Sequence, residues 1–456
     1  MKLTEDEIPE LIRRIAIPAS LGFFFNTMFN VVDTYFAGQL STDSLAALSL
    51  SFPIYFIIAG IGIGIQSGAG ALIANALGAD DTTRAVRLQS QAIVLAVGVT
   101  VAIAIPLYLA LPGIFTFFGA EGAVLAGGLR YMRVITAGGV AIVTANTLNA
   151  GLQARGESTV FRNLLIAMSV LNVGLDPLLM FGLSVGGVQL VPAMLEGGTA
   201  LATVGLYASG IGYLLYRGVH LGVFSGATPR DFIPHRELLR EITGQSTPAA
   251  LNFMIMTLGS FVINYFISRY GRDPIAAYGA ALRIEQIALL PLLGINVALA
   301  TLAGQNNGAG RLDRVREALA ASIRAALKVT AVILPAVLLL APWLLGIFTE
   351  TARVVTIGRR YLYIQGITFF SYILINLSSS ILQGLKRPGM IMWIGLYRQL
   401  AAPFLVFPLL AYGLGMEENG VFWGLAVVNW SAAIVLFFYA RRILARAEIS
   451  AGVRRG

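Results

Sequence analysis

The sequence predicts an all-α polytopic membrane protein with twelve transmembrane helices in two six-helix lobes. The first observation is composition: 57% of the residues are hydrophobic, 12% are charged and the mean hydropathy is +0.78, whereas soluble domains carry about 25% charged residues. The second is a series of apolar runs of about 20 residues or more, long enough to cross a bilayer as helices. The third is an internal repeat that divides these runs into two equal sets.

Polar breaks separate twelve apolar runs, which we take as candidate spans. Several contain Gly or Pro, which membrane helices tolerate where neighbouring helices satisfy the freed backbone groups. The predicted spans are 15–39, 46–76, 90–111, 130–153, 163–183, 197–217, 243–268, 276–304, 325–348, 360–384, 391–413 and 420–440.

The repeat appears when the sequence is aligned with itself at the shift that pairs Pro18 with Pro248 and Tyr131 with Tyr361. Each half then holds six spans, so both halves have the same topology. Such parallel repeats are related by a pseudo-twofold axis along the membrane normal, as in many transporters. The predicted domains are an N-terminal lobe at 1–217, a cytoplasmic linker loop at 218–240 and a C-terminal lobe at 241–456.

Positive residues set the predicted orientation. With a cytoplasmic N-terminus, 21 Lys and Arg residues fall in inside segments and 7 in outside segments. Both termini should therefore be cytoplasmic, in the cell (inner) membrane. The net charge of +9 is explained by topology, and we expect no nucleic-acid partner.

In the first half of the chain, two acids lie within predicted spans, Asp33 in the first and Asp176 in the fifth. An intramembrane carboxylate costs roughly 2.5–3.5 kcal/mol on insertion scales, so it is a functional candidate. Asn172 shares a helical face with Asp176, and Thr203 in the sixth span lies at a similar predicted depth. Two nearby carboxylates cannot both stay ionised cheaply, so the four residues could hold a proton or Na⁺. The alternative is that each Asp bonds a neighbouring helix.

Amide side chains form two further polar stripes. Asn26 and Asn30 share the face of Asp33 on the first span, while Asn146, Asn149 and Gln153 lie on one face of the fourth. The fourth-span stripe falls nearer the inner side than the acids. It either lines a substrate cavity or forms helix–helix hydrogen bonds.

The second lobe differs chemically from the first. Arg283 and Glu285 lie in span eight and Arg398 in span eleven, and we expect a structural polar network there. Pro18 and its partner Pro248 should kink their helices or let them bend, because proline removes a helix hydrogen bond.

Several kinds of chemistry have no matching residues. Cysteine is absent and the only histidines, His220 and His235, lie in a polar loop, which excludes disulfides and thiol or His-based intramembrane sites. No GxxxxGK[ST] sequence occurs, so ATP does not drive the protein directly. We expect no cofactor, and either energy from an ion gradient or passive movement.

Three stretches resemble the multidrug and toxic compound extrusion (MATE) family: PASLGFFFNTMFNVVDTYFAGQL, NTLNAGLQARGEST and ALRIEQIALLPLLGINVALATLAGQNNGAGR. The resemblance covers essentially the whole chain, and the aspartate pair looks like the DinF-like or archaeal branch. It implies a V-shaped exporter that exchanges organic cations and lipophilic compounds for H⁺ or Na⁺.

The resemblance also implies residue roles. The cation site would comprise Asp33, Asn172, Asp176 and Thr203, the first helix would bend at Pro18, and Asn149 would line the cavity. The seventh and tenth spans lack the acids of the Na⁺-coupled branch.

These observations favour a secondary active antiporter that acts as a monomer in membrane lipid on amphipathic or cationic small molecules. A lipid-linked precursor flippase of the same superfamily is the alternative, although flippases usually need a cationic cavity. An intramembrane aspartyl protease using Asp33 and Asp176 is a third hypothesis; we expect no enzyme.

Overall fold

The computed structural model describes residues 1–186 and 188–453, with side chains as far as Ile449. Two arginines counted for the topology, Arg454 and Arg455, and the last residues of the predicted second domain lie outside the described residues. Within the described part, twelve helical segments are long and apolar enough to cross a membrane. The predicted all-α fold with twelve spans is therefore confirmed.

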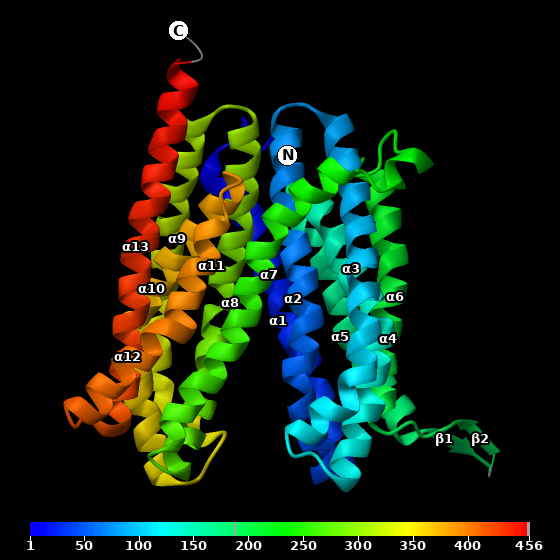
Figure 1. Ribbon diagram of the computed structural model, residues 1–456, viewed down its shortest axis with the longest axis vertical. Helices are drawn as coiled ribbons and strands as arrows, with labels where there is room; N and C mark the ends of the chain where they lie inside the picture. The colour runs from blue at the N-terminus through cyan, green and yellow to red at the C-terminus, as the bar shows by residue number, and fades with distance from the viewer. Residues whose placement is uncertain (187, 454–456) are drawn as a thin grey trace. The chain divides into compact units, whose positions relative to one another are not determined.

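The first half of the chain forms six long helices and a small hairpin (Figure 1). The elements are α1 (Ile8–Leu40), α2 (Thr42–Gly78), α3 (Thr82–Phe117), α4 (Gly122–Ala154), α5 (Ser158–Phe181), β1 (Leu183–Val185), β2 (Val188–Val191) and α6 (Glu196–His220). The strands pair antiparallel, with Val185 opposite Val188. The all-α prediction missed this hairpin because its short strands lie almost entirely in the break between the fifth and sixth predicted spans.

The second half repeats the same helix order. After the 3-10 turn η1 (Pro229–Phe232) come α7 (Arg236–Ser268), α8 (Arg272–Gly308), α9 (Leu312–Gly346), α10 (Ala352–Gly384), α11 (Gly389–Leu396), η2 (Tyr397–Ala401), α12 (Ala402–Pro408), η3 (Leu409–Gly413) and α13 (Glu417–Val453). The shift that pairs Pro18 with Pro248 also carries both ends of α2 onto those of α8, and both ends of α4 onto those of α10. The helix bounds thus follow the predicted repeat.

The helices differ from the predicted spans in two ways. Most begin several residues earlier, because hydropathy detects the apolar part of a helix and not its polar ends. The eleventh span, predicted as one run over 391–413, is interrupted by the π-helical segments η2 and η3. Wide turns of this kind are rare and often occur at functional sites.

The chain forms two compact units. Unit 1 contains Met1–Ser20, Leu77–Asp80 and the chain from Leu251 onward, and unit 2 contains Leu21–Ala76 and Asp81–Ala250. These units differ from the predicted lobes: residues 1–20 belong with the second half, and residues 241–250 belong with the first. The segment predicted as a linker contains the end of α6, η1 and the start of α7.

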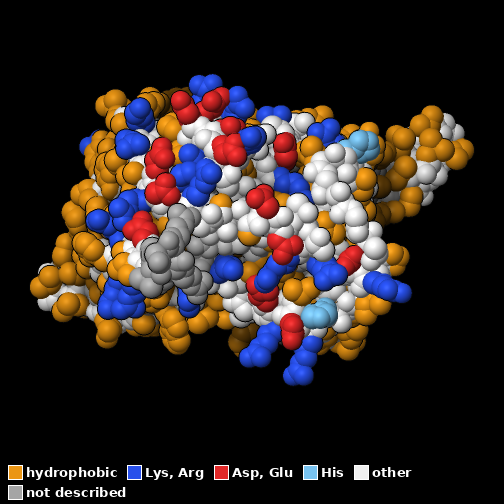
Figure 2. All heavy atoms as spheres, turned by 90° about the horizontal axis from the view of Figure 1, so that it is seen from above, with side chains coloured by type: hydrophobic (Ala, Val, Ile, Leu, Met, Phe, Trp, Pro, Cys, Tyr) orange, Lys and Arg blue, Asp and Glu red, His pale blue; other side chains and the backbone are white. Residues whose placement is uncertain are grey.

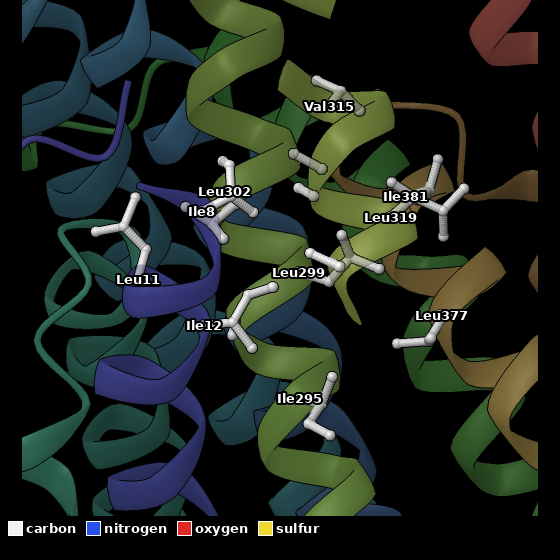
Figure 3. Packing of buried hydrophobic residues seen from close by; sticks show 14 of the residues in the cluster. Ile8, Leu11, Ile12, Ile295, Leu299, Leu302, Val315, Leu319, Leu377 and Ile381 are labelled. Carbon is white, nitrogen blue, oxygen red and sulfur yellow. The ribbon is translucent and has the colours of Figure 1, made fainter. Parts of the chain in front are cut away.

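Packing in unit 1 explains why it includes the beginning of the chain. Ile8, Leu11 and Ile12 of α1 are buried in one apolar cluster with residues of α8, α9 and α10 (Figure 3). Asn306 donates to the Leu3 carbonyl at 3.2 Å, and Arg314 donates to the Asp6 carbonyl at 2.6 Å. Apolar burial and side-chain hydrogen bonds to backbone carbonyls together fix this segment on unit 1.

The two units are built in the same way. In unit 2, α4 is the central helix, with α3 and α6 packed on it; in unit 1, α10 packs on α8, α9 and α13. Charged side chains gather at the end where the chain begins and α13 ends, with hydrophobic side chains around the margin (Figure 2). That distribution is what two membrane-spanning units with a charged aqueous end require.

Candidate functional site

The strongest polar cluster in unit 2 joins α1 to α5 through one amide. The Nδ2 of Asn172 donates to Oδ1 of Asp33 at 2.7 Å and to Oδ2 of Asp176 at 3.2 Å. Because both bonds share one donor atom, the two carboxylate oxygens lie no further apart than two hydrogen-bond lengths placed end to end. The four-residue spacing on α5 places Asn172 and Asp176 one helical turn apart on the same face.

Burial makes this cluster electrostatically demanding. Asp33 is 6% exposed, while Asn172 and Asp176 are 0% exposed. Charges removed from water cost several kcal/mol each unless they are paired, and no Lys or Arg forms a salt bridge with either acid among the described residues. Two uncompensated carboxylates would therefore be costly at this site.

Three buried oxygens in this part of unit 2 lack hydrogen-bond partners among the described residues. Within the described chain, Asn172 Oδ1, Asp176 Oδ1 and Thr203 Oγ1 are buried without a hydrogen-bond partner. Buried oxygens are nearly always satisfied, and carboxylate, amide and hydroxyl oxygens are the ligands that hard cations prefer. The same carboxylates could instead carry a proton.

Helix packing places Thr203 at the level of the acids. The helices α5 and α6 pack against each other, with Gly198 beside Leu179 and Gly210 beside Leu164. Position 203 on α6 falls between these two contacts, opposite the stretch of α5 that contains residues 172–176. Thr203 is 2% exposed.

Three tyrosines that sequence reasoning did not single out lie near Asp33. Tyr55 of α2, Tyr131 of α4 and Tyr207 of α6 all lie close enough to interact with it electrostatically. Tyr207 also interacts with Asn26, which places the predicted Asn26 near the cluster. The available signal was a tyrosine hydroxyl inside a span, which needs a polar partner when buried.

The other residues predicted to line the cavity mainly form hydrogen bonds within their own helix or to a neighbouring one. Asn30 donates to the Asn26 carbonyl at 2.8 Å, and Asn146 donates to the Ile142 carbonyl at 3.0 Å, each one turn back on its own helix. Gln153 accepts from Gln66 of α2 at 2.9 Å.

The polar stripe on α4, formed by Asn146, Asn149 and Gln153, is separate from the acid cluster. It begins at Asn146, which lies about four helical turns beyond Tyr131, or about 22 Å along the helix. Asn149 is 6% exposed and its Oδ1 is buried without a partner in the described chain.

Unit 1 also contains a buried acid, Glu285. Of the predicted polar network of Arg283, Glu285 and Arg398, only Arg398 interacts with this acid. Glu285 is 2% exposed and accepts from the Tyr361 hydroxyl at 2.8 Å. Arg398, in the π-helical segment η2, interacts with Glu285 electrostatically and donates to Asn429 at 3.3 Å. Arg283 is exposed and lies over the Phe348 ring, because residues two apart on a helix point in different directions.

The repeat explains one similarity between the buried acids. Tyr131 lies beside Asp33 and Tyr361 is bonded to Glu285, and the repeat pairs these two tyrosines with each other. Each occupies the same position on the central helix of its unit.

The repeated prolines lie beside the unit boundaries. Pro18 is two residues before the boundary after Ser20, and Pro248 is two residues before the boundary after Ala250. Both α1 and α7 continue through their proline as helices, so bending remains a prediction.

Sequence reasoning missed an ion pair at the start of α6, between the exposed Arg130 and a buried glutamate. Glu196, at the start of α6, is 3% exposed; it accepts from Arg130 Nε at 2.9 Å and from Ser44 at 2.6 Å. A Cβ on Gly127 would lie 2.6 Å from Glu196 Oε1, so the approach requires glycine. Together with Ser44, the pair joins α2, α4 and α6.

Together, these features define a polytopic helical membrane protein of two repeated units with a buried carboxyl pair in one of them. The chain belongs to the MatE family, whose model matches residues 18–178 and 248–408. The second match begins and ends at the positions that the repeat pairs with the ends of the first, which confirms the predicted repeat.

Individual relatives support this membership. The chain is similar to the FAD transporter of Shewanella oneidensis (24% identity, 96% of this chain and 95% of the relative). It is also similar to the multidrug export protein MepA of Staphylococcus aureus (27% identity, 92% and 90%). Its fold matches an outward-facing multidrug resistance MATE transporter of the MOP superfamily (24% identity, 98% of both chains, TM-score 0.89).

Proposed function

We propose that this protein is a secondary active multidrug efflux antiporter that exports organic cations and other lipophilic compounds in exchange for H⁺ or Na⁺. The observation that carries the proposal is the Asn172 amide, which bonds two buried carboxyl groups from different helices. A site of this kind is unstable when both acids are charged and no cation is bound. Its cation occupancy is therefore tied to the packing of α1 on α5.

The four residues at the site have distinct proposed roles. Asp33 and Asp176 neutralise the coupling ion, and Asn172 holds them in register. With H⁺, one carboxyl carries the proton and can donate to its neighbour. With Na⁺, Asn172 Oδ1, Asp176 Oδ1 and Thr203 Oγ1 are the additional oxygens that would hold the ion.

Coupling requires that the ion changes another part of the protein. Asp33 lies on the part of α1 that belongs to unit 2, while Pro18 lies on the part that belongs to unit 1. Loss of the α1–α5 hydrogen bond on ion exchange would free α1 near Pro18. We propose that this bend links the ion site to the substrate cavity, where Asn26 and Asn149 contribute amide groups.

The remaining assignments follow from the same reasoning. We propose the DinF-like or archaeal branch, cytoplasmic termini, an inner-membrane location and a monomer without a cofactor. MepA is named as a multidrug exporter, whereas another relative is named an FAD transporter. We favour the multidrug substrate class because the buried carboxyl pair of unit 2 suits cations better than anions.

The alternative is a lipid-linked precursor flippase of the same superfamily. Such a protein would bind pyrophosphate through cationic groups, and the half-buried Arg398 is a cation that could serve this purpose. Arg398 is already beside Glu285, which argues against that use. An aspartyl protease would need a water between Asp33 and Asp176, where Asn172 instead bonds both.

Transport in proteoliposomes tests the proposal. Ethidium movement should follow an imposed proton or sodium gradient in the wild-type protein and should be lost in Asp33→Asn. The exposed acid Asp43, at the start of α2, supplies the matched control Asp43→Asn, which should transport normally. Movement that ignores both gradients, or that survives Asp33→Asn intact, would overturn the coupling site and favour the flippase.

A further inference from the structure

An apolar groove lies on unit 2 at the inner ends of α3, α4 and α6. Its volume is about 390 Å³, within the range of about 300–1,000 Å³ typical of ligand sites. The residues that shape it are Ile93 of α3, Leu148 of α4, Leu215 and Val219 of α6, and Phe224 and Phe232 of the following loop.

Helix packing and hydrogen bonds form the groove in advance. Both α3 and α6 pack on α4, so α4 supplies the floor. The loop that closes the inner end is fixed by Gln91, whose side chain donates to the carbonyls of Asp231 and Ile233 at 2.7 Å each and accepts from His235 N at 2.8 Å. Arg155 also donates to the Gly222 carbonyl at 2.7 Å.

The walls of the groove suit a hydrocarbon chain. Leu215, Val219 and Phe232 are 40%, 62% and 39% exposed, and they lie on helices that cross a membrane or directly beside them. Exposed apolar patches of this kind mark binding surfaces. Because the surrounding medium at α3 and α6 is lipid, an acyl chain is the ligand with immediate access.

Two exposed arginines, Arg87 and Arg230, lie beside the lining residue Phe232. Arg87 contacts Asp231 at 3.4 Å but is 60% exposed. Arg230 is exposed, two positions from Phe232, and forms no salt bridge within the described chain. Basic pockets between transmembrane helices on the cytoplasmic side bind anionic lipid head groups.

We propose that this groove is a binding site for an anionic phospholipid. One acyl chain fills the groove between α3 and α6, and the phosphate lies on Arg87 and Arg230. The site is independent of the acid cluster, because it uses other residues and a different end of α4. It is also independent of the proposed transport function.

Native mass spectrometry of the purified full-length protein tests the proposal. Phosphatidylglycerol and phosphatidylcholine with identical chains are added in equal amounts, and retained lipid is measured. We expect preferential retention of phosphatidylglycerol. Val219→Trp, which fills the groove, should lower retention at least tenfold, while Leu109→Trp, at a position on α3 that is 75% exposed and outside the groove, should not.

Head-group recognition is tested separately. Arg87→Gln and Arg230→Gln should each lower phosphatidylglycerol retention about fivefold, the effect of one basic residue near an anionic lipid, and should not change phosphatidylcholine retention. Equal retention of the two lipids, no effect of Val219→Trp, or displacement of the lipid by ethidium would each overturn the proposal. Displacement would show that the groove binds transported amphiphiles instead.

Discussion

The Asn172 amide offers the sharpest test of the acid cluster, through Asn172→Ala. The substitution removes the bonds at 2.7 Å to Asp33 and 3.2 Å to Asp176. A hydrogen bond is worth about 1.5–3 kcal/mol to a charged partner and about 0.5–1.5 kcal/mol to a neutral one. With one carboxyl charged and one neutral, the expected loss of unfolding free energy is about 2–4.5 kcal/mol.

Measurements on membrane proteins indicate a smaller loss of unfolding free energy than this range. Side-chain hydrogen bonds between transmembrane helices average about 0.6 kcal/mol in double-mutant cycles. The present amide is 0% exposed and bonds two acids, so an alternative partner in the unfolded protein does not replace it easily. We therefore expect a loss near the lower end, about 2 kcal/mol.

A double-mutant cycle isolates the interaction. Unfolding free energies are measured in detergent for the wild type, Asn172→Ala, Asp33→Ala and the double variant, because alanine removes the acceptor oxygen that asparagine would keep. We expect a coupling energy above about 1 kcal/mol, because residues in contact within one network couple by about 0.5–3 kcal/mol. A coupling energy near zero would show that the amide does not hold Asp33, and the reasoning about the site would fail.

Two further predictions concern the ends of unit 2. Gly127→Ala should destabilise the protein by about 1–3 kcal/mol, because the added Cβ would displace the Glu196 carboxylate. Thermal unfolding measures this loss. The control Gly98→Ala, where a Cβ meets nothing within 4 Å, should cause no such loss. Hydrogen bonds from Thr228 lower the pKa of Asp231 below its ordinary value. The stability that ionised Asp231 contributes to this loop is therefore complete above the unfolded pKa of about 3.9. It is lost as the pH falls through the lower pKa of the folded protein. Hydrogen exchange of residues 221–235, corrected for intrinsic rates, should therefore accelerate only in that acid range, and Asp231→Asn should remove the pH dependence; acceleration that begins near neutral pH would contradict the assignment.

Sequence patterns predicted most of the architecture because each depends on local or repeated features. Span length follows from the bilayer thickness, so hydropathy located all twelve spans. The repeat located the second half by pairing Pro18 with Pro248, and the two family matches begin at these same residues. The helix ends were less predictable, because polar turns continue a helix without an apolar signal.

The candidate site was predictable only in part. Asp33 and Asp176 stand out because acids are rare in spans, and Asn172 follows from its spacing. The tyrosines at 55, 131 and 207 were not identified, since an amphipathic ring in a span reads as apolar. The contact between Asn172 and Asp33 joins residues 139 positions apart, and no local pattern encodes such a distance.

The sequence by itself determined that this protein crosses a membrane twelve times, in two repeated halves, with its acids confined to particular spans. Only the tertiary structure decided which polar groups meet: it brought Asp33 to Asp176, kept Arg283 away from Glu285, and packed the first twenty residues on the second half of the chain. The physical reason is that burial and periodicity are properties of neighbouring residues. Partner choice between helices is decided by how their side chains pack.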